Sequence, residues 1–409
     1  MQGSLFVFHS SLTMAPRKTP SISLDTGGDE PALLAPRAGS LIADCRGPEG
    51  VTGVTADDMV AGAISDEAHA PPLGSHVVPG DRVVIAVSGG IPEREAVLRA
   101  IHRSLELAGI TPPDIAIIDS APESDADTAY LAADEEGLPC YLSRSLVDAD
   151  VVVVVGGFSW DASLGGRSLE GELWPTFSRP ESRQAVTCQL ARRGRLALPH
   201  WRTEMQQIEW NLGVTANLRL VAGRHGTLAA AVFGLPNGAR RAAGQAAAAW
   251  RPAVTREAAV TIASLSRPLP GPAAVSPTAA SGFDAAVRAV AAAARVTHEE
   301  ATICLVGRLG CQPGVIFSRW RQGAPLQGLV HEAVGTKDSQ LIADALQTRL
   351  FARALGDRRL VMLTDLDEAI VEDLEFGYAE SAEDVARLAA KAESLIVLHE
   401  ADRMLPGVR

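Results

Sequence analysis

Lysine is almost missing from this chain. The only lysines among 37 basic residues are Lys18, Lys337 and Lys391, and the others are arginine. A site anywhere between residues 19 and 336 therefore has no amine side chain to use. With 49 acidic residues the formal net charge is −12, which disfavours a broad nucleic-acid-binding surface. A small anion bound in a locally basic cleft remains compatible with this charge.

Paired patterns of cysteine and histidine are missing as well. The five cysteines are odd in number and include no C-x-x-C pair, and the nine histidines include no H-x-x-x-H. We therefore expect neither a disulfide framework nor a structural zinc site, and a reducing cytoplasm fits best. No apolar run approaches about 18 residues, so no membrane-spanning helix is expected. Neither a Walker loop nor a G-x-S-x-G elbow is present.

The length and composition favour a two-domain globular protein. The chain has 409 residues, of which 47% are hydrophobic and 21% charged, enough for two cores of ordinary size. A proline-rich stretch at 266–277 follows an alanine-rich helical run, so we place a boundary near residue 250. The predicted parts are a disordered extension over 1–35, a first domain over 36–250 and a second domain over 251–409.

Strand and helix patterns alternate in both halves, which predicts an α/β fold with mostly parallel sheets flanked by helices. In the first half, Val97, Ile101 and Leu105 mark one apolar helix face, and Gly109 marks the helix end. The predicted strands are 82–87, 115–118, 151–155, 258–263, 302–306, 360–364 and 395–398. The predicted helices include 125–136, 239–250, 283–295, 339–355 and one that starts at 381–384 and ends near 391.

The run of five valines at 151–155 is the central element. Five β-branched residues without polar alternation are typical of a strand covered on both faces. Glycines follow at 156–157, where the strand is expected to end. Ligands of open α/β sheets bind outside the carboxyl ends of the strands, so the loop after these valines is the best site candidate by position.

Four consecutive residues in that loop could hold a phosphate. Gly165 and Gly166 allow close backbone approach, Arg167 offers a bidentate guanidinium, and Ser168 adds a hydroxyl. The alternative is a plain glycine-containing loop.

Three further candidates follow strands. Ser88, Gly89 and Gly90 resemble a nucleotide-binding turn, but no third glycine follows and a tight strand-to-helix connection is the favoured interpretation. Glu123 lies where a general base would belong, or in a segment that caps the next helix. Asp161, after the valine strand, leaves the same two interpretations open.

Order and spacing over most of the chain resemble the nickel-pincer lactate racemase family. The features are the strand 83–87 ending at Ser88, Gly109-Ile110 before 114–118, and the valine strand leading to Gly165-Gly166-Arg167. Near the end, 362–366 is followed by 381–385. The resemblance implies two α/β domains with a cleft that holds a small-molecule anion. It also implies racemase or epimerase chemistry on 2-hydroxy acids.

In this family a nickel pincer nucleotide takes a hydride from the substrate carbon and returns it to either face. Two histidines exchange protons, a lysine tethers the cofactor and another histidine binds nickel. Carried over by the resemblance, the cofactor-binding positions are Ser88, Gly90, Gly165, Gly166, Arg167 and Ser168.

Most of the reactive groups are substituted here. The family's Asp-x-Thr-Arg falls on 88–91 and its tethering lysine on Ser168. Its catalytic histidines fall on Glu123 and on Phe158 or Asp161, its nickel-binding histidine near Gln184 and its second-domain lysine near Ala291. A hydroxyl cannot form the amide-type linkage of an amine, and each lost acid or base costs about 10²–10⁴-fold in rate.

These substitutions predict lost or altered activity and weak cofactor binding, and two hypotheses follow. The first is an isomerase in which Glu123 and Asp161 act as substitute acid and base. The second is a non-catalytic protein that binds a small anion, with Arg167 as the anchor, or serves as a scaffold. Convergence of Glu123, Asp161 and Arg167 on one pocket would favour the enzyme.

Overall fold

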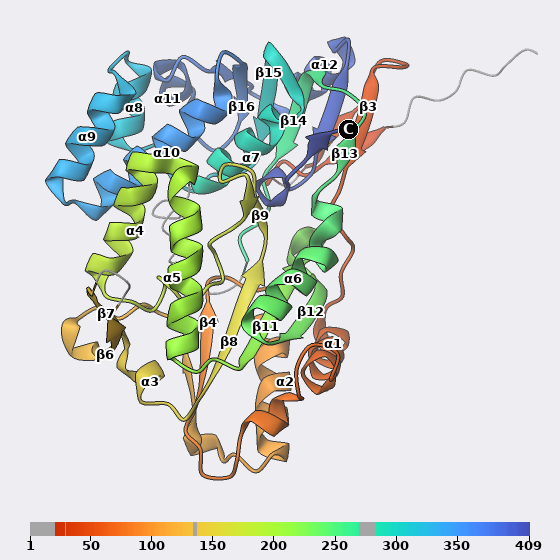
Figure 1. Ribbon diagram of the computed structural model, residues 1–409. Coiled ribbons are helices and arrows are strands. Elements are labelled where there is room, and N and C mark those ends of the chain that lie inside the picture. Colours follow the sequence, from red (N-terminus) through yellow and green to blue (C-terminus); the bar gives the residue numbers. More distant parts are fainter. Residues whose placement is uncertain (1–20, 29, 134–136, 270–282) are drawn as a thin grey trace, which may run out of the picture.

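Two open β-sheets, one above the other in Figure 1, form the centre of the protein. The computed structural model describes residues 21–28, 30–133, 137–269 and 283–409. Helices flank both sheets, and nearly all neighbouring strands within them are parallel. The predicted fold class, mostly parallel sheets flanked by helices, is confirmed. No helix in the described ranges has both the length and the apolar character needed to cross a membrane.

The lower sheet has five strands among the described residues, in the order β12-β11-β8-β4-β5. Only the pair β11 and β12 is antiparallel. Its strands are β4 (Val83–Ser88), β5 (Ile115–Ile118), β8 (Val151–Phe158), β11 (Ala216–Ala222) and β12 (Leu228–Gly234). The helices beside it are α1 (Gly53–Ser65), α2 (Arg94–Leu107), α3 (Arg144–Val147), α5 (Leu198–Asn211) and α6 (Pro236–Ala246).

The valine strand β8 lies in the middle of this sheet and is covered on both faces. Val153 and Val155 belong to the apolar cluster with α1 and α2, whereas Val152 and Val154 belong to the cluster with α3 and α5. This arrangement confirms the interpretation of the valine run. The predicted end is wrong, because β8 continues through both glycines to Phe158.

The upper sheet has six parallel strands in the part of the chain that is described, in the order β17-β16-β15-β14-β18-β3. They are β3 (Leu41–Cys45), β14 (Ala258–Ser264), β15 (Thr297–Val306), β16 (Arg359–Leu363), β17 (Gly377–Tyr378) and β18 (Leu395–Leu398). The helices of this region are α7 (Asp284–Ala294), α8 (Val315–Arg321), α9 (Leu326–Thr336), α10 (Ser339–Leu355), α11 (Glu368–Asp373) and α12 (Ala382–Lys391).

Different elements cover the two faces of the upper sheet. Helices α7 and α10 share one apolar cluster with Ile303 and Leu305 of β15. Helix α12 and the hairpin of β1 (Ile22–Leu24) with β2 (Ala32–Leu34) share the cluster on the other face. Strand β3 pairs with β18, so residues 41–45 belong to the upper sheet although they precede the whole lower sheet in sequence.

Two predicted segments differ from the structure. The sequence predicted disorder over 1–35, of which 1–20 and 29 lie outside the described residues. The remainder includes the buried β1–β2 hairpin. The helix predicted over 125–136 is wrong, since β6 (Thr128–Ala133) pairs there with β7 (Pro139–Ser143). Pairing with a strand from further along the chain overrode the local helical propensity.

The other connections contain small elements. Helix α4 (Pro180–Arg193) precedes α5 and lies against α9 and α10 of the upper region. Two short strand pairs complete the fold: β9 (Trp160–Asp161) with β10 (Gly166–Arg167), and β13 (Ala253–Val254) with β19 (Gly407–Val408).

Candidate functional site

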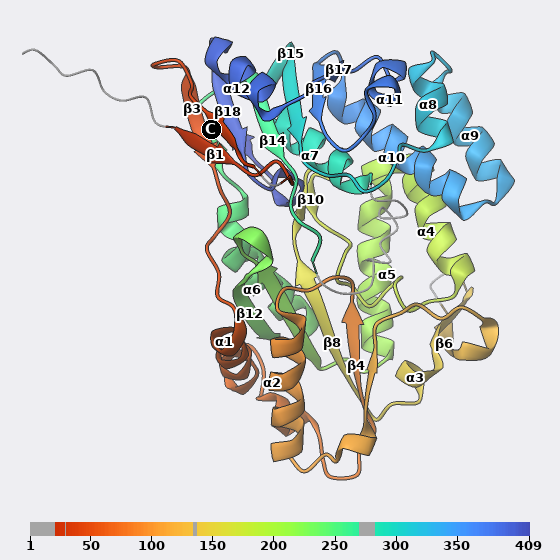
Figure 2. The same ribbon diagram turned by 180° about the vertical axis from the view of Figure 1, so that it is seen from behind.

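A cleft of about 470 Å³ lies between the carboxyl ends of the two sheets. Strands β4 and β8 run toward the upper sheet in both Figure 1 and Figure 2, so their last residues form the lower wall. The upper wall comes from the segments that follow β14, β15 and β18 and from the start of α7. Ligands of open α/β sheets bind at such strand ends, which makes this cleft the candidate functional site.

Glycines shape the lower wall. Gly89 has a φ of +76°, and a Cβ on Gly90 would come within 3.1 Å of Leu269. A Cβ on Gly156 would lie only 2.0 Å from the carbonyl oxygen of Gly171. The glycines after the valines therefore let the returning chain cross the end of β8, and they leave backbone rather than side chains along this edge.

A buried arginine holds two carboxylates on the upper side of the cleft. Arg288 of α7 contacts Glu170 at 2.6 Å and Asp284 at 2.9 Å. Burial raises the pKa of Asp284 to about 7, with the positive charge of Arg288 opposing the shift and nearby carboxylates adding to it. Asp284 thus carries a proton that it can exchange near neutral pH, as a general acid or base must.

The third carboxylate on the same side, Asp402, has both of its oxygens hydrogen-bonded within the protein. Asp402 is buried, and it accepts hydrogen bonds from the backbone N–H of Ser266 at 2.7 Å and from its hydroxyl at 2.6 Å. This pair holds the segment after β14 against the segment after β18. Asp402 is therefore a positioning residue for the wall.

Arg308, which follows β15, is the one arginine lining the cleft that has no ion pair among the described residues. Its side chain is exposed and makes no hydrogen bond or ion pair with any residue in the described ranges. By comparison, the neighbouring Arg403 is buried and contacts Glu400 at 3.1 Å. Arg308 can therefore bind an anionic ligand without first breaking an internal contact.

Three of the residues predicted from the sequence line this cleft, namely Ser88, Gly89 and Gly90. The Ser88 hydroxyl points away from a ligand, because it donates to the carbonyl of Glu172 at 2.8 Å and contacts Thr176 at 3.1 Å. The turn Ser88-Gly89-Gly90 thus leads from β4 toward α2, and its only side chain is held inward.

Glu123, Asp161 and Arg167 do not converge on the cleft. Glu123 is exposed in the connection after the edge strand β5. Asp161 is buried and accepts hydrogen bonds from the Ser163 hydroxyl at 2.5 Å and the Leu164 N–H at 3.0 Å. Burial raises the pKa of Asp161. None of the three is among the residues that line the cleft.

The segment 165–168 forms the second half of a small hairpin. Gly166 pairs with Asp161, and Gly165 has a φ of +72° with the Arg195 guanidinium packed against it. The Ser168 hydroxyl is buried and accepts a hydrogen bond from the N–H of Glu170 at 3.0 Å. The Arg195 guanidinium therefore occupies the space that Gly165 leaves open, and the Ser168 hydroxyl is used within its own turn.

Arg167 contributes to a buried ion network beneath the cleft. It lies 3.6 Å from Glu172, which also contacts Arg219 and Arg240, and Arg240 in turn contacts Glu209. Burial favours the neutral form of Glu172, but the three arginines outweigh it and lower the pKa to about 2. Burial lowers the pKa of Arg167 to about 10. This network connects the hairpin to β11, α5 and α6.

The solved structures show which fold this is. The chain matches the lactate racemase apoprotein from Thermoanaerobacterium thermosaccharolyticum with a TM-score of 0.68. The match covers 95% of this chain and all of that one, at 13% identity. The chain has the lactate racemase fold. A structural-genomics protein from Thermotoga maritima also matches, with a TM-score of 0.56 and 10% identity over 89% of this chain and all of that one. A scan of family models and a search of curated proteins find no match.

The cluster of Glu170, Asp284 and Arg288 was missed from the sequence. Asp284 and Arg288 are four residues apart at the start of a helix, a spacing that predicts an ion pair on one helix face. Glu170 is distant in sequence, and only the tertiary fold brings it to Arg288. The i, i+4 pair was thus the one local signal available.

Proposed function

We propose that the cleft binds a small carboxylate-bearing molecule, of the size of a 2-hydroxy acid, without nickel-dependent racemisation. The observation that carries this proposal is the guanidinium of Arg308, which has no partner among the described residues and faces the same cleft as the glycine edge at Gly89 and Gly90. Arginine binds carboxylates in a two-pronged geometry, and glycine lets a ligand approach the backbone closely.

The balance of charge around the cleft supports an anionic ligand. The carboxylates of Glu170 and Asp284 share Arg288, and Asp402 is satisfied by Ser266. Because these acids are already neutralised or hydrogen-bonded, Arg308 is the charge that remains for a ligand among the described residues of the cleft. An anionic ligand bound to the exposed Arg308 would keep part of its hydration shell. We therefore expect the cleft to bind it with modest affinity.

The residues present do not fit the nickel pincer nucleotide that the resemblance implies. The position of the tethering lysine holds Ser168, whose hydroxyl is buried within its own turn. Within the described ranges no three His, Cys, Asp or Glu side chains are arranged to hold a metal ion. A hydroxyl cannot take the place of the amine in the linkage, so this site offers no tether for that cofactor.

Ligand titration with L-lactate and D-lactate tests the proposal by isothermal calorimetry. We expect saturable binding by the wild type and at least about tenfold weaker binding by Arg308→Gln, since a charge-assisted contact is lost. Arg319→Gln removes a surface arginine that pairs with Glu332 and is the matched control. Equal affinities of wild type and Arg308→Gln would contradict the proposal.

The rejection of nickel chemistry has its own test. We expect no bound nickel after co-expression with the enzymes that make the pincer nucleotide. Stoichiometric nickel in the purified protein, together with interconversion of the lactate enantiomers, would overturn this part of the proposal and leave the binding part standing.

A second candidate function is proton-transfer catalysis, favoured by the pKa of about 7 at Asp284. A carboxyl group that titrates near neutral pH can remove and return a proton at a substrate carbon. Wash-in of deuterium from D₂O at the C2 position of lactate would reveal this activity, and Asp284→Asn should abolish it. Absence of exchange in the wild type would exclude this function for lactate.

A further inference from the structure

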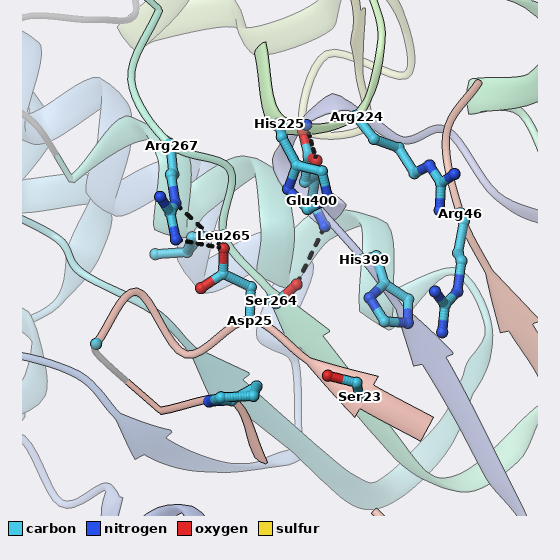
Figure 3. Close-up of a pocket in the computed structure, with 12 residues that line it drawn as sticks. Ser23, Asp25, Arg46, Arg224, His225, Ser264, Leu265, Arg267, His399 and Glu400 are labelled. Atoms are coloured by element: carbon cyan, nitrogen blue, oxygen red, sulfur yellow. Dashed lines mark hydrogen bonds and ion pairs between the residues drawn. The ribbon is translucent and has the colours of Figure 1, made fainter. Parts of the chain in front are cut away.

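A second pocket, of about 350 Å³, lies beside the cleft at the carboxyl ends of three adjacent strands (Figure 3). Arg46 follows β3, His399 follows β18, and Ser264 ends β14. The turn at Arg224 and His225, between β11 and β12 of the lower sheet, forms another part of its lining. Strand ends in this arrangement are where α/β sheets bind ligands.

His399 is held by a carboxylate and presents its other nitrogen to the pocket. Its Nε2 lies 2.7 Å from Oδ1 of Asp44, on the neighbouring strand β3. Burial would raise the pKa of Asp44, but the hydrogen bond and charge of His399 and the charge of Arg46 lower it overall. Because Asp44 engages Nε2, Nδ1 is the ring nitrogen left for a ligand.

Two arginines line the same pocket while their carboxylate partners lie outside the lining. Arg46 contacts Asp44 at 3.0 Å, and Arg224 contacts Glu49, whose side chain is 85% exposed. The Nε of Arg224 is buried and has no hydrogen-bond partner in the described part of the chain. Each guanidinium therefore keeps N–H donors for a further acceptor.

The remaining charges of the pocket are paired. Arg267 contacts Asp25 at 3.1 Å. Glu400 accepts from the N–H of His225 at 2.8 Å and contacts Arg403. His225 and Glu400 both have left-handed backbone conformations, with φ of 59° and 55°. His225 and Glu400 thus both have a disfavoured backbone conformation, and one hydrogen bond between them joins the lower and upper sheets. Together they shape this wall of the pocket.

We infer that this pocket binds a small molecule carrying a phosphate group. Arg46 and Arg224 offer cationic donors from two elements and His399 adds a ring nitrogen from a third, which suits a tetrahedral dianion with three terminal oxygens better than a planar carboxylate. The volume exceeds what the phosphate alone needs, so an organic substituent fits beside it. Apart from Arg267, the charged residues of this site do not line the cleft, and the inference is independent of the proposed function.

Calorimetric titration with glycerol 2-phosphate, with inorganic phosphate and acetate as comparison ligands, tests the inference. We expect one saturable site for glycerol 2-phosphate in the wild type, competition by inorganic phosphate and no competition by acetate. Arg46→Gln and Arg224→Gln should each weaken binding by about tenfold or more, as expected for a lost charge-assisted contact.

Arg82→Gln is the matched control, because Arg82 also pairs with a nearby aspartate, Asp150, but lies at the opposite end of the lower sheet. Thermal unfolding verifies that all variants are folded. Arg308→Gln should leave phosphate binding unchanged and so separates this pocket from the cleft. Absence of saturable binding, unchanged affinity in both pocket variants, or equal competition by acetate would overturn the inference.

Discussion

Replacing Asp284 by asparagine tests the electrostatics of the cleft through the pH dependence of stability. The Asp284 side chain is 12% exposed, and burial is the main cause that raises its pKa from 3.8 to about 7. Arg288 opposes this shift, whereas the carboxylates of Glu170, Asp402 and Asp161 add to it. In the unfolded chain these neighbours disperse and the group returns to an ordinary aspartate pKa.

The sign of the effect follows from proton counting. Between the unfolded pKa of 3.8 and the folded pKa of about 7, the folded state holds a proton that the unfolded state has released. The stabilisation from Asp284 is therefore complete below the lower value and is lost as the pH rises through the upper one. At about 1.4 kcal/mol per pH unit, the loss between about pH 5 and about pH 7 is roughly 3 kcal/mol.

Urea unfolding of wild type and Asp284→Asn across this pH range measures the difference directly. Asparagine resembles the protonated acid, so the variant should gain about 3 kcal/mol relative to wild type as the pH rises. Titrating groups that do not interact with Asp284 cancel in the difference. Asp58→Asn, at an exposed position of α1, should show no such trend. Parallel stability curves for wild type and Asp284→Asn would refute the raised pKa.

Two further predictions concern stability. Glu172→Gln leaves Arg219 buried without a carboxylate partner and Arg240 with Glu209 alone, and it should cost about 3–5 kcal/mol in urea unfolding. Because the pKa of Glu172 is lowered from 4.5 to about 2, its stabilisation is complete above pH 4.5 and is lost as the pH falls toward 2. A Glu172→Gln cost below about 1 kcal/mol would mean that the network is not buried as described. Gly171→Ala places a Cβ 2.2 Å from the Gly157 carbonyl oxygen at a φ of +77° and should destabilise by at least about 2 kcal/mol. Its control, Gly62→Ala in α1, meets no atom within 4 Å and should be neutral or stabilising, so equal effects of the two would contradict the close crossing at β8.

Elements that carry their own end signals were predicted with the bounds observed. Helix α10 begins after Asp338, whose side chain accepts from two N–H groups of the first turn, and ends at Gly356 with a φ of +57°. Helix α12 begins with the predicted capping box of Ser381 and Asp384. The segment predicted as a helix over 125–136 also had a candidate cap, but pairing of 128–133 with β7 decided its conformation.

The expectation that ligands bind at the carboxyl ends of strands correctly identified part of the candidate site. Ser88 and Gly90 follow a strand end and do line it. Asp161 and Arg167 also come after a strand, but the β9–β10 hairpin directs both toward internal partners. The direction of a side chain beyond a strand end depends on contacts with residues that are distant in sequence. The spacing of residues along the chain does not reveal these contacts.

The sequence alone determined the alternation of strands and helices and the central place of the valine strand, since periodicity and β-branching act over a few residues. Only the tertiary structure decided which charges meet. Arg288 and Glu170 are 118 residues apart, and Asp44 and His399 are 355 residues apart. Asp44 and His399 meet because the parallel strands β3 and β18 are paired, and Glu170 and Arg288 meet because the fold brings a loop of the lower region and helix α7 to the same cleft.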